Sequence, residues 1–163
     1  MTIQVPRNGT RGTKQPQMPK SLMAGLNRLF NGIYRRLGSR MQISGRPLLL
    51  LTTIGAKSGQ QRETVLGYWN EEGAADGSVL VAATAGGSAV QPAWLHNLAR
   101  NPDKVWVERA GERLHVTPEA LTGTEREAAW QKITDASAQY RSYNDKTDRE
   151  IPVVRLRPVA GRA

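Results

Sequence analysis

The segment GAKSGQQR carries groups that are suited to holding an anion. Lys57 and Arg62 supply positive charge, Ser58 supplies a hydroxyl, and Gly55 and Gly59 let backbone N–H groups approach a ligand. A nucleotide-binding P-loop places Lys-Ser after its second glycine and before a helix. Here the pair precedes Gly59 and a strand follows, so the segment indicates another kind of anion cradle, with a solvated hairpin tip as the alternative.

A second candidate binding segment, ATAGGSAVQPAW, ends one predicted strand and begins a short predicted helix. Gly86 and Gly87 leave room for a flat ring or a phosphate against the backbone. The helix N-terminus at Pro92 favours an anion. Trp94 has a ring that can stack on a ligand, and the alternative is a core tryptophan packed with its leucine neighbours.

Two tyrosines near the C-terminus form a third candidate. Tyr140 and Tyr143 fall three residues apart at the end of the last predicted helix, which puts both on one face. Their phenols can donate hydrogen bonds to a carbonyl or nitro oxygen, and ordinary half-buried tyrosines are the alternative. We interpret Asp148-Arg149, just before the last strand, as a local ion pair and turn.

The composition narrows the chemistry further. The chain has no cysteine, which excludes disulfides, thiolate metal sites and a cysteine nucleophile. Its two histidines, His96 and His115, lie in different segments, and no cluster has metal-ligand spacing, so no metal site is expected. Catalysis would therefore depend on an organic cofactor.

The formal net charge of +9 is unevenly distributed. Of 23 lysines and arginines, 11 lie within residues 1–62, which contain none of the 14 acidic residues. This asymmetry favours an acidic ligand or an anionic membrane surface. Nucleic acid is not expected as a partner, because aromatic residues do not interleave with the basic run. No apolar run is long enough to span a membrane, and residues 1–18 lack the apolar core of a secretory signal. We expect a cytoplasmic protein with a disordered basic tail over residues 1–18.

One domain is expected over residues 19–163. Its first element is an amphipathic helix over residues 19–38, with apolar residues at helical spacing: Leu22, Leu26, Leu29, Phe30, Ile33 and Leu37. We expect this stripe to pack on its own domain, and an anionic membrane surface is the alternative.

Strands dominate the rest of the chain. The patterns predict strands over 46–55, 62–69, 78–87 and 151–159, a hairpin over 104–121, and helices over 91–102 and from 124 to about 140. Because several strands are joined by hairpins, we expect an α+β fold in which a mainly antiparallel sheet curls into a small barrel flanked by helices.

Four motifs together resemble one family. LLTTIGAKSGQQR, VLVAATAGG, PAWLHNLARNP and YNDKTDREIPVVRL come in the order and spacing of the deazaflavin (coenzyme F420)-dependent nitroreductase family, between Pro47 and Pro158. The resemblance implies a split β-barrel of the FMN-binding type. It also implies a deazaflavin coenzyme with a ribityl phosphate and an acidic oligoglutamate tail. The implied reaction is hydride transfer from reduced F420 to a quinone, an enone or a nitro compound.

The resemblance also assigns roles to residues. Contacts with the phosphate and the acidic tail are implied for Lys57, Ser58, Gly59 and Arg62. Residues implied to flank the deazaflavin ring and its phosphate are Ala83, Thr84, Ala85, Gly86, Gly87, Pro92, Ala93 and Trp94. The acceptor is implied to lie beside Tyr140, Tyr143 and Thr84.

Three positions depart from the family pattern. Ala85 stands where relatives often carry lysine or another polar residue, so one phosphate contact is expected to be missing or replaced. Gly67 stands where the best-known nitroreductase has a bulky aromatic residue, which predicts a more open substrate side. Ala136 occupies a position that some relatives fill with a third tyrosine.

Alternatives stay open at this level. The protein is an enzyme, a deazaflavin or flavin carrier without turnover, or a peripheral binder of anionic membranes. FMN is the alternative coenzyme. A monomer and a homodimer are both compatible with the sequence.

Overall fold

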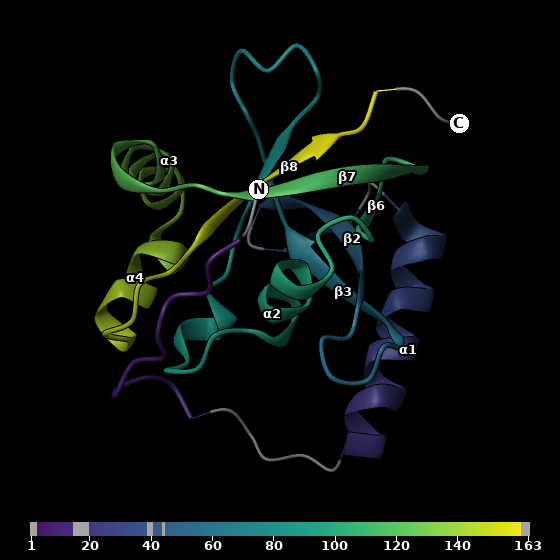
Figure 1. The fold of residues 1–163 in the computed structure, drawn as a ribbon, viewed down its shortest axis with the longest axis horizontal. Helices are drawn as coiled ribbons and strands as arrows, with labels where there is room; N and C mark the ends of the chain where they lie inside the picture. The colour runs from purple at the N-terminus through teal and green to yellow at the C-terminus, as the bar shows by residue number, and fades with distance from the viewer. Residues whose placement is uncertain (1–2, 15–19, 39–40, 44, 161–163) are drawn as a thin grey trace.

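The computed structural model describes residues 3–14, 20–38, 41–43 and 45–160 (Figure 1). The helices in the described part of the chain are α1 (Lys20–Leu37), the short 3₁₀ helix η2 (Ala85–Gly87), α2 (Ala93–Arg100), α3 (Gly123–Ala136) and α4 (Ala138–Lys146). The strands are β1 (Gln42–Ile43), β2 (Arg46–Ile54), β3 (Gln61–Gly67), β4 (Trp69–Asn70), β5 (Val79–Ala82), β6 (Trp106–Arg109), β7 (Glu112–Ala120) and β8 (Val153–Pro158).

The sheet is antiparallel throughout its described pairings and curls on itself. Its order is β1-β2-β6-β7-β8-β5-β4, and β3 also pairs with β2. Tyr68 alone separates β3, which pairs with β2, from β4, which pairs with β5 at the far end of that order. Because β3 and β4 are consecutive in the chain but pair at opposite ends of this order, the sheet must curl to bring its two ends together. This confirms the predicted α+β class and the curled, mainly antiparallel sheet.

Strand β2 is buried on both faces, as its apolar run predicts. Leu49 and Leu51 face the barrel interior, in the core cluster that also contains Leu95 and Leu98 of α2. Leu48 and Leu50 point the other way, in the cluster with Tyr34 of α1. The alternation follows from the two-residue period of a strand.

Helices flank the barrel on opposite sides in Figure 1, with α1 on one side and α3 and α4 on the other. α3 covers β5 and β8 through a second apolar cluster that includes Trp130, Ile133, Leu80 and Val153. A single helix was expected here, but the chain is extended at Ser137 (φ −151°, ψ 112°), and the helix is divided there.

Helix α1 contacts the barrel through polar residues rather than through its apolar stripe. The Tyr34 hydroxyl lies 2.8 Å from the carbonyl oxygen of Glu108, and Arg35 pairs with Glu63 at 2.6 Å. Burial raises the pKa of Tyr34 to about 12. The described members of the stripe are all exposed: Leu26, Leu29, Phe30, Ile33 and Leu37. The expectation that this stripe packs on its own domain is therefore wrong. No helix in the described part of the chain has the length and apolarity needed to cross a membrane.

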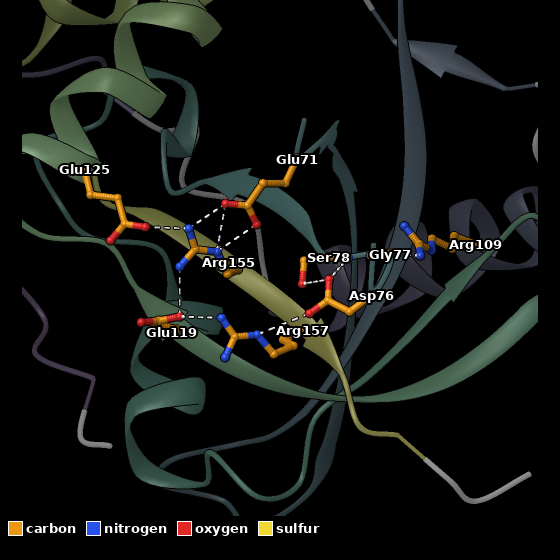
Figure 2. A network of polar contacts seen from close by, with 9 residues as sticks. All are labelled: Glu71, Asp76, Gly77, Ser78, Arg109, Glu119, Glu125, Arg155 and Arg157. Atoms are coloured by element: carbon orange, nitrogen blue, oxygen red, sulfur yellow. Dashed lines mark hydrogen bonds and ion pairs between the residues drawn. The ribbon is translucent and has the colours of Figure 1, made fainter. Parts of the chain in front are cut away.

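A network of charged residues fastens the segment between β4 and β5 to the sheet (Figure 2). Arg155 on β8 pairs with Glu71 at 2.5 Å, Glu125 at 2.6 Å and Glu119 at 3.0 Å. These carboxylates raise the pKa of Arg155 above its ordinary value. Arg155 thus links the segment before β5, the sheet and the first turn of α3.

The N-terminal residues 3–14 lie along the glycine loop, which we define as residues 83–91. The Thr13 N–H donates to the carbonyl oxygen of Gly87 and the Gly9 N–H donates to that of Ala89, each at 2.8 Å. Ile3 is buried in the barrel core. The disordered tail expected over residues 1–18 is therefore wrong for residues 3–14, because backbone pairing and an apolar anchor order them. Residues 1–2 and 15–18 lie outside the described residues.

Candidate functional site

The cation loop, residues 55–62, is a tight turn between β2 and β3. It closes through a hydrogen bond from the Gly55 N–H to the carbonyl oxygen of Gln60 at 2.8 Å. Gly59 has φ +65°, a conformation that favours glycine. Arg62 extends beside Ser58, with 3.4 Å between a guanidinium nitrogen and Oγ. The turn therefore gathers Lys57, Ser58 and Arg62 on an exposed surface, as the sequence predicts.

Helix α2 holds the cation loop in place through Asn97. This buried amide accepts from the Ala56 N–H at 2.9 Å and donates to Thr53 Oγ1 at 3.0 Å. Asn97 was not predicted as a functional residue, although an amide among the apolar residues of a helix is a usable signal. Ala93 begins the same helix where the glycine loop ends, and four residues of helix span roughly 6 Å. Both loops therefore meet α2, about one turn apart.

The glycine loop has a backbone shape that can bind an anion. Thr84 is in the right-handed region (φ −71°, ψ −33°), whereas Ala85, Gly86 and Gly87 have φ values of +46°, +63° and +80°. A right-handed residue followed by a left-handed one turns successive N–H groups toward one point. Gly86 is exposed and Gly87 is buried. Ala85 has an unusual left-handed conformation for a residue other than glycine. The N–H groups of Thr84 and Gly87 already donate to the carbonyl oxygens of Ala82 and Thr84, and the predicted contact of Thr84–Gly87 with a coenzyme stays a prediction.

The buried side chain of Arg149 holds the backbone of the glycine loop in this conformation. Its guanidinium donates to the carbonyl oxygens of Thr84 at 2.7 Å, Ser88 at 2.7 Å and Ala83 at 2.9 Å. A further donor reaches Gln91 Oε1 at 2.9 Å. The side chain is buried, and desolvation lowers the pKa of Arg149 below its ordinary value. Within the described residues no carboxylate pairs with this guanidinium. The interpretation of Asp148-Arg149 as a local ion pair is therefore wrong.

Asp148 instead binds the N-terminal segment, residues 3–14. Its carboxylate accepts from the N–H groups of Thr10 and Arg11, both at 2.9 Å, and from the Thr10 hydroxyl at 2.6 Å. These donors lower the pKa of Asp148 to about 2. Asp148 and Arg149, adjacent in sequence, thus hold two different segments against each other.

The start of α2 differs in detail from the prediction. The helix begins at Ala93, and Pro92 is its N-cap residue, in an extended conformation. Ala93 is exposed, but Trp94 is only 7 % exposed and belongs to the barrel core. Trp94 is therefore a core tryptophan, which was the alternative to a ligand-stacking role. Its predicted contact with a coenzyme stays a prediction.

Three aromatic rings, those of Trp69, Tyr140 and Tyr143, form a row that we call the tyrosine row, and α4, which carries the two tyrosines, packs against η2 of the glycine loop. The ring centroids of Trp69 and Tyr140 are 4.6 Å apart, and those of Tyr140 and Tyr143 are 5.5 Å apart, both edge to face. Burial raises the pKa of Tyr140 to about 12, with a further contribution from Tyr143. The Tyr140 phenol therefore keeps its proton at neutral pH and is available as a hydrogen-bond donor.

Tyr140 also occupies the space that Gly67 leaves. A Cβ added at Gly67 would lie 3.2 Å from the Tyr140 hydroxyl oxygen, so a larger side chain there would displace the phenol. The more open substrate side expected near Gly67 stays a prediction, because this contact involves Tyr140 and not a substrate. Trp69 lines a cavity of about 680 Å³ between β4, β5 and α3, with Leu80 and Ile133 among its apolar walls.

These groups fit the coenzyme that the resemblance implies. Exposed cations and a hydroxyl in the cation loop suit an acidic tail, and the backbone of the glycine loop suits a phosphate. Tyr140 and Tyr143 provide phenol groups that can donate to an acceptor oxygen. The side chains that would hold the coenzyme come from two loops that meet the same helix.

Comparison with known proteins agrees with this geometry. Residues 26–158 match the family model described as F420H(2)-dependent quinone reductase. The chain is 39% identical over 139 residues to an F420H(2)-dependent quinone reductase of Mycobacterium tuberculosis (strain ATCC 25618 / H37Rv), covering 80% of this chain and 89% of the relative.

Two solved structures are also similar. The structure of an F420-H2 dependent reductase (FDR-A) is 38% identical, with a TM-score of 0.58, covering 68% of this chain and 94% of the other. A structure described as a domain-swapped dimer is 31% identical, with a TM-score of 0.60, covering 83% of this chain and 98% of the other. The chain therefore belongs to the F420H(2)-dependent quinone reductase family, whose coenzyme is reduced F420.

Proposed function

We propose that this protein reduces quinones with a hydride from reduced F420. The observation that supports the proposal most is the pair Tyr140 and Tyr143, whose rings lie together on α4, the helix that packs against the glycine loop. When bound, the coenzyme supplies the hydride. The protein's own residues bind, orient and donate hydrogen bonds, and none needs to form a covalent bond.

The two loops divide the binding work. Lys57 and Arg62, both exposed, attract the acidic tail and hold it by charge. The Thr84–Gly87 backbone holds the phosphate and one side of the ring, and Arg149 keeps that backbone from relaxing. A rigid loop lowers the entropic cost of ordering the coenzyme.

The tyrosines act on the acceptor. Reduction of a quinone to a quinol needs one hydride and one proton, and negative charge develops on the oxygen while the hydride arrives. A hydrogen bond from the Tyr140 Oη–H stabilises that charge, because the phenol remains protonated at neutral pH. Tyr143 and Thr84 border the same space in this proposal.

An apolar acceptor agrees with the surroundings of Trp69. The adjoining cavity has an apolar wall that includes Leu80 and Ile133, beside charged residues such as Glu71, and this apolar wall suits a quinone with a hydrocarbon substituent. Enones and nitro compounds also present an oxygen to a phenol donor, and they are the other acceptor classes we propose.

The proposal is tested by mixing protein, reduced F420 and a quinone such as menadione, and following coenzyme absorbance. We expect coenzyme oxidation that depends on the protein and the quinone. Failure to bind F420 at micromolar concentration would refute the proposal. Binding without oxidation across quinones, enones and nitroarenes would instead favour a carrier, and retention of FMN but not F420 after desalting would favour the alternative coenzyme.

We also propose that a cytoplasmic form of this protein meets anionic membranes through α1. The apolar stripe faces away from the barrel, with Leu29 62% and Leu37 52% exposed. Arg28 and Arg36 are exposed on the same helix and can meet lipid phosphates. Such contact would bring the protein to the membrane, where apolar quinones partition.

A further inference from the structure

Lys146, the last residue of α4, lies against the glycine loop. A Cβ added at Gly87 would come within 2.9 Å of Lys146 Cβ and 3.1 Å of its Cδ, so the aliphatic stem crosses directly over that glycine. Gly87 is thus required twice, for its φ of +80° and for the passage of this side chain. The sequence analysis gave Lys146 no role.

The ammonium group of Lys146 is held near the tyrosine row. Its Nζ lies 5.3 Å from the ring centroid of Tyr143, at a distance that permits a cation–π contact. The side chain is exposed, and no ion pair joins it to a carboxylate within the described residues. Its charge is therefore available to a ligand that approaches the loop.

Two features of this surface favour an anionic ligand. The N–H groups of Thr84 and Gly87 already donate to the carbonyl oxygens of Ala82 and Thr84, so a ligand would meet the exposed backbone at Gly86. Arg149 draws the carbonyl oxygens of Ala83, Thr84 and Ser88 toward itself, so these negative dipole ends point into the protein. Lys146 adds a positive charge beside the same backbone.

We propose that Lys146 binds the phosphate of the coenzyme at the glycine loop, from α4 rather than from the loop itself. It thereby supplies the positive charge that Ala85 does not. This inference rests on the proposed F420-dependent function and adds to it a specific phosphate-binding residue.

The test is equilibrium binding of oxidised F420 with short and long glutamate tails, compared with binding of the deazaflavin riboside, which lacks both the phosphate and the tail. A loss that is the same for both tail lengths assigns Lys146 to the phosphate, and a loss that grows with tail length overturns that assignment. Lys146→Met keeps the stem and removes the charge, and Lys146→Arg keeps the charge. Lys132→Met is the matched control, because Lys132 is an exposed lysine on α3 that pairs with Glu72. We expect Lys146→Met to raise the Kd for F420 about tenfold at low salt and to leave the Kd for the riboside within about twofold, as the loss of one exposed charge-assisted contact implies. High salt should shrink the difference.

The outcomes separate the two proposals. Wild-type protein that binds F420 while Lys146→Met binds it equally well overturns the role of Lys146 alone. Equal weakening for F420 and the riboside also overturns it, because the residue would then support the ring or the fold. Wild-type protein that does not bind F420 overturns the proposed function together with this inference.

Discussion

A guanidinium nitrogen of Arg149 donates to the carbonyl oxygen of Thr84 across 2.7 Å, although 65 residues separate the two in sequence. The same side chain reaches the carbonyl oxygens of Ala83 and Ser88. The left-handed conformation of Ala85 costs free energy on its own, and these contacts hold it. The glycine loop is therefore shaped by a residue outside it.

Replacing Arg149 should damage both stability and coenzyme binding. We expect Arg149→Met to lower the free energy of unfolding by about 3 kcal/mol, because several buried carbonyl oxygens lose their donor. Arg149→Lys should recover little, since one ammonium cannot reach the same set of acceptors. Urea denaturation measures the change. Arg157→Met is the control, because Arg157 is 54% exposed and its ion pairs are superficial. Equal small losses for both variants would contradict the role of Arg149.

The cation loop should recognise the length of the coenzyme tail. Lys57→Ala combined with Arg62→Ala should weaken F420 binding most for coenzyme with long glutamate tails, because exposed cations act on exposed carboxylates. Titration with F420 fractions of defined tail length measures this. Lys132→Ala should have no effect. If the double substitution weakened binding by the same factor at every tail length, Lys57 and Arg62 would not bind the glutamate tail.

Tyr140 should act as a neutral donor across a wide pH range. Tyr140→Phe should lower kcat for menadione about a hundredfold, the scale of losing one hydrogen bond to developing charge, with little change in the Kd for F420. Spectrophotometric titration of phenolate formation should show one high-pH ionisation, near pH 12, disappear in Tyr140→Phe.

The sign of the stability effect follows from that pKa. Because the folded pKa of about 12 exceeds the ordinary 10.0, the contribution of neutral Tyr140 is complete below pH 10 and is lost as pH rises through 12. A Tyr140 phenol that ionises near pH 10 would contradict its burial beside Trp69.

The outward stripe of α1 should govern membrane binding. Wild-type protein should co-sediment with phosphatidylglycerol vesicles and less with phosphatidylcholine vesicles, and Leu29→Asp should weaken partitioning roughly tenfold. Because Leu29 is exposed, the substitution should leave Tm unchanged. Val159→Asp is the control, because Val159 is an exposed valine that follows β8 and lies outside α1. A concentration-dependent dimer that Leu29→Asp disrupts, without vesicle binding, would mean that a second copy covers the stripe.

Asp148 should hold the N-terminal segment in a pH-dependent way. Its folded pKa of about 2 lies below the ordinary 3.8, so its contribution is complete above pH 3.8 and is lost as pH falls through 2. Asp148→Asn should speed tryptic cleavage after Arg11 at neutral pH, because the amide cannot reproduce all three accepted hydrogen bonds. Asp145→Asn is the matched control, since only the backbone carbonyl of Asp145 contacts Arg11. Equal cleavage of both variants and wild type would show that other contacts hold this segment.

Local patterns in the sequence determined much of the fold. The apolar run of β2, the turn residues of the cation loop and the helical stripe of α1 each report the geometry of a few neighbouring residues, so the order of elements and the curled antiparallel sheet could be predicted. The spacing of Tyr140 and Tyr143 similarly placed both phenols on one face, and their rings do lie together.

Tertiary structure decided what these elements face. Arg149 and Asn97 act on loops far away in sequence, and α1 turns its polar side to the barrel because Tyr34 and Arg35 find partners there. The Tyr140 phenol fills the space beside Gly67. Such relationships depend on which surfaces meet when distant segments pack, and a period of two or 3.6 residues carries no information about the partner. The sequence by itself determined the chemical groups and their local spacing, whereas long-range hydrogen bonding and packing decided how they form one site.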